Sequence, residues 1–435
     1  MDSIRELSSI ADEARRKYRS QLNDDSMSKR PNNEDLRPRS DGEFQRDYAR
    51  IMYSSSFRRL QGKMQLLGIK NDQFFRNRLT HSLEVAQIAR SIAYELKYDQ
   101  SEIFVVEAGA LAHDIGNPPF GHAGEAKLNE LFSDIGGFEG NAQTLRILTN
   151  VEKKKPNFVG LNLTYRSLLS VVKYFTKKDE THKKKFIYDD DYDLLKNFIL
   201  ENDIHVRTLD VQIVDKADEI AYAAHDLEDG LRIKAFVIDE ILHEYTRSKY
   251  YNQECYSKLE ELVKSAKEKS GFNNNKIDSS EYSKLFRQEL SSSIINTLIS
   301  DLYLIDVEQI PDDFKNKTGT TNDKELYFSR YGDLAAGLKD IVFRCINNNN
   351  DVYYYEKKGE KLLEFLKNFY INNKKALPPE YRADTLIDRY SIEGLVEDDY
   401  QKRLICDYIS GMMDSYAINV YEQITGKSFD NILGD

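Results

Sequence analysis

RLTHSLEVAQIARSIA (residues 78–93) and LAHDIGNPPFGHAGEA (residues 111–126) together decide the fold of this chain. After His81, apolar residues recur at the spacing of one helix face, which predicts an amphipathic helix that begins near this histidine. The second stretch completes an apolar, alanine-rich run and then meets a glycine and two prolines, which are common helix stop signals. His113 and Asp114 are therefore expected in the last turn of a buried helix.

The His113–Asp114 pair suggests a metal site. A buried carboxylate at the C-terminal end of a helix is disfavoured by the helix dipole and needs a compensating cation or hydrogen-bond donors. Standing alone, the pair could equally be a hydrogen-bonded helix end. Here His81 opens a second apolar helix and a further acidic cluster follows at Asp218. Imidazole and carboxylate ligands suit Zn, Mn, Fe, Co and Ni and, less well, Mg, so we expect a divalent metal.

The same residues fit the H…HD…D pattern of the HD-domain phosphohydrolases. A longer series of motifs resembles the deoxyguanosinetriphosphate triphosphohydrolase (dGTPase) branch of that family. The similar segments, in the order of the family, are FRRLQGKMQ (57–65), RNRLTHSLEVA (76–86), HDIGNPPFGHAGE (113–125), FEGNAQTLRIL (138–148), GLNLTYRSLL (160–169), ADEIAYAAHDLEDG (217–230) and RLICDYISGMMDSYA (403–417). The scarcity of strand patterns indicates an all-α protein, and the resemblance implies an HD-domain helical core with an accessory C-terminal helical lobe.

The resemblance also implies the metal ligands. They are His81, His113, Asp114 and Asp218. In related HD enzymes the metal aspartate is followed by a tyrosine four residues later and an aspartate eight residues later. Tyr222 and Asp226 give Asp218 this spacing, which places all three near one helix face. Asp215 lacks the spacing and is interpreted as a helix-face or capping carboxylate.

The implied reaction is hydrolysis of dGTP, or of deoxynucleoside triphosphates (dNTPs) more broadly, to deoxynucleoside and inorganic triphosphate. Attack at the α-phosphorus expels a nucleoside 5′-oxygen, a poor leaving group that benefits from a proton donor. His122 and Glu125 are the expected acid/base pair, because a spacing of three puts them on one helix face. Whether His122 activates water or protonates the leaving group stays open, and the alternative is a plain surface histidine.

Substrate contacts are expected from six residues. The chain has a formal net charge of −11, so a triphosphate requires a local basic cluster. Arg78, three residues before His81, is the first candidate for a phosphate contact. The resemblance implies phosphate contacts from Lys173 and Tyr174, and Lys185, from a lysine-rich run, is a weaker candidate. The resemblance also implies sugar and base contacts from Gln65, Tyr222 and Asp226.

Composition restricts the remaining possibilities. Three isolated cysteines support neither a disulfide framework nor a cysteine-based zinc site. No apolar run is long enough to span a bilayer, and no signal peptide is recognisable, so we expect a cytoplasmic protein without membrane contact. We expect three regions: a charged arm and linker (1–40), the catalytic core (41–260) and a C-terminal accessory and oligomerisation region (261–435).

Cofactor and partners follow from the resemblance. We expect Mg²⁺ or Mn²⁺ in use, with Zn, Ni, Co or Fe as further candidates. The expected partners are the nucleotide, further copies of the chain in a homo-oligomer (hexamers occur among relatives) and single-stranded nucleic acid as a secondary ligand. The late motif implies that Arg403 or Tyr416 approaches a pocket. Two alternative functions remain: a broad, nucleotide-activated dNTP hydrolase, and an HD-fold nucleic-acid-binding or regulatory protein.

Overall fold

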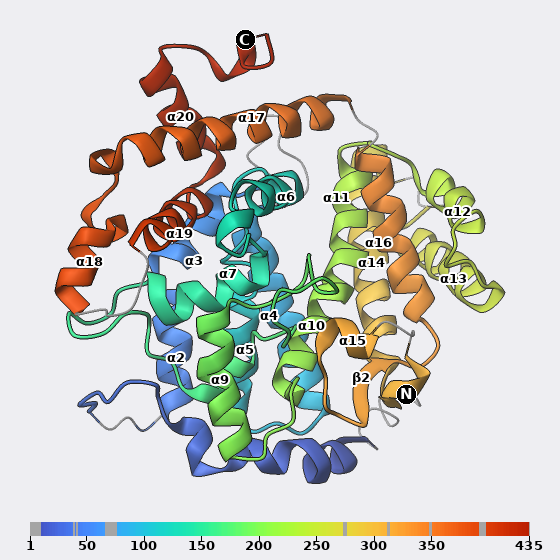
Figure 1. The fold of residues 1–435 in the computed structure, drawn as a ribbon. Helices are drawn as coiled ribbons and strands as arrows, with labels where there is room; N and C mark the ends of the chain where they lie inside the picture. The colour runs from blue at the N-terminus through green and yellow to red at the C-terminus, as the bar shows by residue number, and fades with distance from the viewer. Residues whose placement is uncertain are drawn as a thin grey trace.

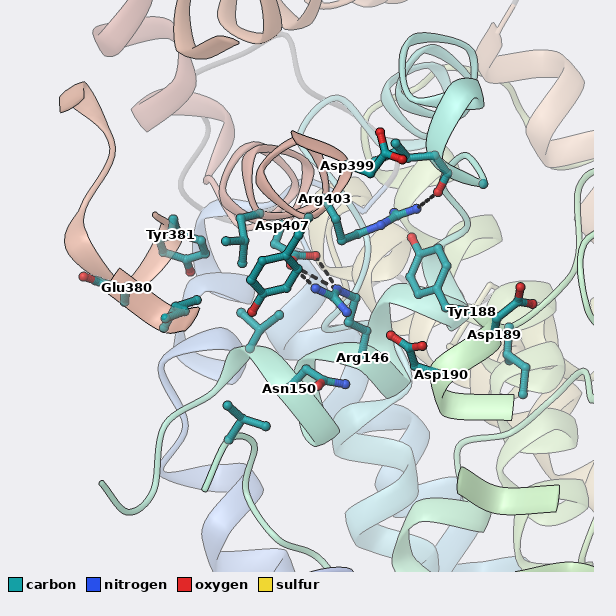
Figure 2. A pocket seen from close by; sticks show the side chains of 18 of the residues that line it. Arg146, Asn150, Tyr188, Asp189, Asp190, Glu380, Tyr381, Asp399, Arg403 and Asp407 are labelled. Carbon is teal, nitrogen blue, oxygen red and sulfur yellow. Dashed lines mark hydrogen bonds and ion pairs between the residues drawn. The ribbon is translucent and has the colours of Figure 1, made fainter. Parts of the chain in front are cut away.

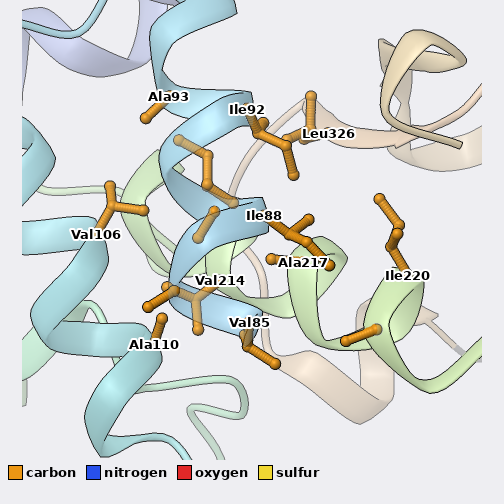
Figure 3. Close-up of a cluster of buried hydrophobic side chains, with 14 of the residues drawn as sticks. Val85, Ile88, Ile92, Ala93, Val106, Ala110, Val214, Ala217, Ile220 and Leu326 are labelled. Carbon is orange, nitrogen blue, oxygen red and sulfur yellow. The ribbon is translucent and has the colours of Figure 1, made fainter. Parts of the chain in front are cut away.

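Three helices form the centre of the molecule: α4 (Arg78–Glu95), α5 (Gln100–Ala112) and α10 (Leu209–Ala221). The computed structural model describes residues 10–37, 40, 42–65, 76–272, 276–310, 314–347, 350–390 and 397–434. The three helices pack on one another through valine, isoleucine and alanine side chains that are almost fully buried (Figure 3). The apolar periodicity of the sequence thus becomes a helical core.

Side-chain caps fix where the first two of these helices begin. The Asn77 side chain accepts from the backbone N–H of Thr80 at the start of α4, and Asp99 does the same for Glu102 at the start of α5. In both cases the third helical side chain bonds back to the cap, which satisfies two backbone donors at once. These caps fix the N-terminal turn of α4 that carries the first histidine of the metal motif.

Further helices surround this centre (Figure 1). In the first part of the chain they are α2 (Gly42–Met52), α3 (Ser55–Arg59), α6 (Gly121–Leu131), α7 (Gly140–Arg146), α8 (Tyr165–Leu169), α9 (Asp189–Glu201), α11 (Leu227–Arg232), α12 (Ile238–Thr246) and α13 (Gln253–Lys269). Later ones are α14 (Ser279–Ser300), α15 (Phe314–Thr318), α16 (Gly332–Asn347), α17 (Asn350–Asn372), α18 (Ala383–Tyr390), α19 (Glu397–Ser410) and α20 (Asp414–Thr425). The π-helical turn η7 (Tyr222–Asp226) continues α10.

Within the described residues the only sheet has two short antiparallel strands. β1 (Leu302–Asp306) and β2 (Lys324–Phe328) pair with Leu302 opposite Phe328 and Asp306 opposite Lys324. The prediction of an all-α fold with a C-terminal helical region is therefore confirmed. No helix in the described ranges combines the length and apolar character needed to cross a bilayer.

The apolar core includes residues from all three expected regions. The main cluster includes Tyr18 and Leu22 from the N-terminal arm and Leu326 from β2, beyond residue 260. A second cluster joins α6 to α17, α19 and α20, and Figure 1 shows α17 passing over α6. The boundaries near residues 40 and 260 stay predictions, and apolar packing crosses both.

Gly116 sets the approach of α7 to the end of α5. A Cβ atom at this position would overlap the backbone of Gly140 and Thr144, so only glycine allows the contact. Across it, the Gly116 N–H donates to Thr144 Oγ1, and Thr144 Oγ1 donates to the His113 carbonyl, both at 3.1 Å. The histidine of the HD motif is thereby held from two helices.

Candidate functional site

The four side chains expected to bind a metal lie together, although they come from three helices. His81 lies in the first turn of α4, His113 and Asp114 directly follow α5, and Asp218 lies in α10. No side chain of the four is more than 9% exposed. The structure therefore groups residues that are up to 137 positions apart in the sequence.

The donor atoms of the four residues converge. His81 Nε2 lies 3.1 Å from Asp218 Oδ1, and His113 Nε2 lies 3.4 Å from the same oxygen and 3.6 Å from Asp114 Oδ1. His113 Nδ1 donates to the Ala110 carbonyl at 2.6 Å, which leaves Nε2 to face the carboxylates. Among the described atoms His113 Nε2 is buried without a hydrogen-bond partner. This donor set fits a divalent cation, and the assignment of the four as ligands stays a prediction.

Both carboxylates of the cluster are held as anions. Burial alone would raise the pKa of Asp114, but the Arg78 guanidinium, 2.7 Å away, and the nearby histidines lower that pKa to about 2. Burial is likewise outweighed at Asp218, where Lys173 and His113 hold the pKa well below its ordinary value. The cluster thus offers two anionic oxygens at neutral pH.

Asp215, the alternative ligand, lies in a different environment. Lys173 Nζ lies 2.9 Å from both Asp215 and Asp218, which are three residues apart on one side of α10. Asp215 also accepts from Arg207 Nη2 at 3.0 Å, and Arg207 in turn pairs with Glu325 of β2. Within the described chain no ion pair joins Asp215 to a histidine. Arg207 was missed by the sequence reasoning, because it lies in a segment without a motif.

His122 and Glu125 lie on the first turns of α6, as expected. His122 Nδ1 is 3.4 Å from Glu125 Oε2, and the histidine side chain is 68% exposed. The other oxygen of Glu125 accepts from the Gly140 N–H at 3.1 Å. Burial would raise the pKa of Glu125, but the contacts with His122 and Lys185 lower it to about 2. An anchored carboxylate thus holds an accessible imidazole.

Of the residues expected at the sugar and base, Tyr222 and Asp226 lie beside or near the cluster. The Tyr222 ring lies 5.0 Å from the His81 ring, centroid to centroid. Asp226 is buried, and its burial together with nearby Asp229 raises its pKa to about 8. Both amide atoms of Gln65 are buried without a hydrogen-bond partner among the described residues. A buried amide without a hydrogen-bond partner costs free energy of desolvation, and its donor and acceptor can bond to a ligand.

The cations expected at the phosphates are already paired with protein carboxylates. Arg78 contacts Asp114, and Lys173 contacts two aspartates of α10. Lys185 Nζ lies 2.7 Å from Glu139 and 5.6 Å from the centre of the Tyr174 ring. A phosphate at any of these positions would have to compete with a carboxylate.

Hydrogen bonds through Lys63 and Asn117 connect the C-terminal region to this site. Lys63 Nζ donates to the carbonyl of Asn117 and, at 2.8 Å, to that of Ser410 in α19. Asn117 in turn donates from its side chain to Asp114. Burial, with a smaller contribution from Arg59, lowers the pKa of Lys63 to about 7. No sequence pattern had indicated these contacts, although Lys63 lies within one of the family-like motifs.

Arg403 and Tyr416 line cavities that are separate from the cluster. Arg403 borders a cavity of about 590 Å³, together with the ion pair of Arg146 and Asp407 (Figure 2). Tyr416 lines a second cavity of about 590 Å³. None of the four cluster residues lines either cavity. The first cavity is lined by both charges: the carboxylates labelled in Figure 2 are Asp189, Asp190, Glu380, Asp399 and Asp407, and the lining also includes Arg146, Lys153, Lys178 and Arg403.

The raised pKa of Asp226 makes stability depend on pH. The folded chain keeps this proton up to about pH 8, whereas an unfolded aspartate loses it near pH 4. The free energy of unfolding should therefore fall as pH rises between these values. We expect Asp226→Asn to raise the free energy of unfolding by a few kcal/mol (order of magnitude) at pH 8 and by much less at pH 5.

Thermal melts of the wild type and of Asp226→Asn at pH 5 and pH 8 test this expectation. Asp239→Asn, at an exposed position of α12, serves as the control for adding an asparagine. A stabilisation of Asp226→Asn that is equal at both pH values would contradict a buried, protonated Asp226.

Comparison with known proteins gives matches over both parts of the chain. Residues 78–223 match the HD domain, and residues 329–423 match the phosphohydrolase-associated domain. A Vibrio cholerae protein named deoxyguanosinetriphosphate triphosphohydrolase-like protein 2 is 44% identical over 88% of this chain and 89% of its own length. A Deinococcus radiodurans protein of the same name is 32% identical over 90% and 94%. A Leptospira interrogans deoxyguanosinetriphosphate triphosphohydrolase-like protein is 32% identical over 88% and 89%.

Proposed function

The chain belongs to the HD-domain family of deoxyguanosinetriphosphate triphosphohydrolase-like proteins, and from this premise we propose that it hydrolyses dGTP to deoxyguanosine and inorganic triphosphate. Family membership makes it a phosphohydrolase. The observation that carries the finer proposal is the buried cluster of His81, His113 and Asp114, whose possible ligand atoms lie within 4.8 Å of one another, with the Asp218 carboxylate beside both imidazoles. The neighbouring His122–Glu125 pair adds a group able to move a proton.

A divalent metal is proposed at this cluster. The four side chains that would hold it are His81, His113, Asp114 and Asp218. When bound, such a metal lowers the pKa of a bound water and polarises a phosphoryl oxygen. We propose Mg²⁺ or Mn²⁺ in use, since oxygen-rich phosphate substrates suit these ions, and the imidazoles also accommodate Zn, Ni, Co or Fe.

The surrounding residues are proposed to hold the substrate. Arg78, Lys173 and Tyr174 are assigned to the polyphosphate, and Tyr222, Asp226 and Gln65 to the sugar and base. Asp226, neutral below about pH 8, can hydrogen-bond a 3′-hydroxyl without repelling the nearby phosphates. A tyrosine ring packed on C2′ would exclude a ribose hydroxyl. Lys173 would release one of its two aspartates on binding phosphate.

His122 and Glu125 are proposed as the proton-transfer pair. Glu125 is fixed by the Gly140 N–H and holds the imidazole at Nδ1, which leaves Nε2 to exchange a proton with water or with the 5′-oxygen. The two roles remain distinguishable by experiment.

Product analysis tests the proposed reaction. We expect deoxyguanosine and intact triphosphate after incubation of the protein with dGTP and Mn²⁺ or Mg²⁺. In the proposed reaction only the bond between the α-phosphorus and the nucleoside 5′-oxygen breaks. Chromatography of the nucleoside and phosphate products decides the result. Orthophosphate or pyrophosphate would show that a different phosphorus–oxygen bond is broken and would contradict the proposal.

Substrate range and partners need parallel assays. Turnover of each of the four dNTPs, with and without a second nucleotide, separates a dGTPase from a broad, nucleotide-activated hydrolase. Light scattering measures the proposed homo-oligomer, and filter binding across a salt series tests single-stranded nucleic acid. A protein that binds single strands but turns over no dNTP would instead be an HD-fold binding protein.

A further inference from the structure

One face of α16 reaches the proposed active site from outside the HD domain. Lys339 and Phe343 are four residues apart and so lie on the same side of this helix. Lys339 Nζ is 4.5 Å from the centre of the Tyr222 ring, and the Phe343 ring is 6.3 Å from the His122 ring. One helix face therefore contacts both Tyr222, the proposed sugar contact, and His122, the proposed proton-transfer residue. α16 packs against η7 and α11, which holds this face in place. Figure 1 shows α11 and α16 side by side.

Most cations around the site are paired with carboxylates, whereas Lys339 and Lys317, which lies 6.0 Å from the centre of the Tyr174 ring, have no carboxylate within ion-pair distance among the described residues. Arg78 pairs with Asp114, and Lys173 with Asp215 and Asp218. Further cations that already have carboxylate partners are Lys185 with Glu139 and Arg207 with Asp215 and Glu325. Among the described residues, no carboxylate lies within ion-pair distance of Lys339. Its ammonium lies over the Tyr222 ring instead.

Nearby Asp226 does not neutralise Lys339. Burial raises the pKa of Asp226 to about 8, so this side chain is largely uncharged at neutral pH. Lys339 is exposed, and a cation–π contact at an exposed site is worth only about 0.5–1 kcal/mol. The ammonium can therefore leave the ring at little cost and reach another partner on its flexible stem.

We propose that Lys339 binds the polyphosphate of the substrate. A triphosphate that enters this site meets cations that are mostly held by carboxylates, whereas Lys339 can form a charge-assisted contact without giving up an ion pair. Lys339 contacts the Tyr222 ring, and the centre of that ring lies 5.0 Å from the centre of the His81 ring. A single aromatic side chain therefore connects this cation to the cluster of proposed metal ligands. The phosphohydrolase-associated segment would thus add a phosphate contact to those proposed for the HD domain. This inference rests on the proposed function.

Lys339→Met tests the proposal, because methionine keeps the unbranched stem and removes the charge. We expect the dissociation constant of inorganic triphosphate, measured by calorimetry on the full-length metal-loaded protein, to rise roughly 10- to 100-fold. The KM for dGTP should rise in parallel. Inhibition by deoxyguanosine, which has no phosphate, should change by less than about twofold, and Lys339→Arg should restore most of the triphosphate affinity.

Lys196→Met is the matched control. Lys196 is likewise an exposed helical lysine whose ammonium lies over a tyrosine ring, 5.8 Å from the centre of Tyr192 in α9, but α9 carries no proposed site residue. We expect wild-type binding and turnover from this variant.

The outcomes separate the two hypotheses. Unchanged triphosphate affinity in Lys339→Met, or equal weakening of triphosphate and deoxyguanosine, would overturn the role of Lys339. A wild-type protein that fails to bind triphosphate would overturn it as well. A wild-type protein that releases no deoxynucleoside from any dNTP would instead refute the proposed function. Calorimetry would still decide whether Lys339 binds the polyphosphate.

Discussion

Asp218→Asn abolishes metal uptake and dGTP turnover together: this is the first result that we expect. Asparagine keeps the shape of the side chain but removes the anionic oxygen that lies near both His81 and His113. Loss of a group that only supports a metal ligand already costs about 10- to 100-fold in affinity, so loss of a ligand should exceed that range. Metal content of the purified, Mn²⁺-loaded protein and its rate with dGTP are the two measurements.

Asp215→Asn gives this experiment its control. Asp215 and Asp218 lie on the same helix, each 2.9 Å from Lys173 Nζ, so both variants remove one carboxylate from the same lysine. Only Asp218 also contacts the histidines. We expect full metal occupancy in Asp215→Asn, and the opposite pattern would show that the wrong aspartate had been chosen.

His122→Ala is expected to lower kcat by about 10²–10⁴, the usual contribution of a positioned acid or base. Metal content and the KM for dGTP should stay close to wild type, because His122 is exposed on α6 and contacts none of the four proposed ligands. His182→Ala is a suitable control, since His182 also pairs with a carboxylate three residues away, at 2.9 Å. A wild-type kcat in His122→Ala would remove this residue from the mechanism.

A second substrate separates the two roles of His122. The triphosphate ester of p-nitrophenol has a leaving group that needs little protonation. If His122 protonates the leaving oxygen, the loss in His122→Ala should be much smaller with this ester than with dGTP. An equal loss with both substrates would assign the residue to water activation.

The central helices could be predicted from sequence because their signals are local. Apolar spacing indicated α4, the alanine-rich run indicated α5, and the glycine and prolines after it indicated where α5 ends. The convergence of His81 and His113 on Asp218 followed from the family resemblance, since no local pattern joins residues more than 100 positions apart. His81 Nε2 and His113 Nε2 lie 3.1 and 3.4 Å from Asp218 Oδ1, and their role as metal ligands stays a prediction.

Charge pairing could not be predicted in the same way. Lys173 was expected to be available to phosphate, yet two aspartates of α10 already hold it, and their spacing of three gave no sign of that lysine. Arg207 is bound to Asp215 nearby and to Glu325 far along the chain. Lys339 has the sequence appearance of an ordinary solvent-facing helical lysine. Its position over Tyr222 depends on how α16 packs, which only the tertiary structure reveals.

The contact between Lys63 and Ser410 has a consequence for synthesis on the ribosome. The lysine and its acceptor are 347 residues apart, so at 5–20 residues per second they emerge roughly 20–70 s apart. During that interval the helices that carry the proposed metal ligands are already made, but the Lys63 amine has only the Asn117 carbonyl and lacks its second acceptor, the Ser410 carbonyl. Nascent chains that end before α19 should therefore reach a helical but catalytically incomplete state and depend on chaperones until the C-terminal helices dock.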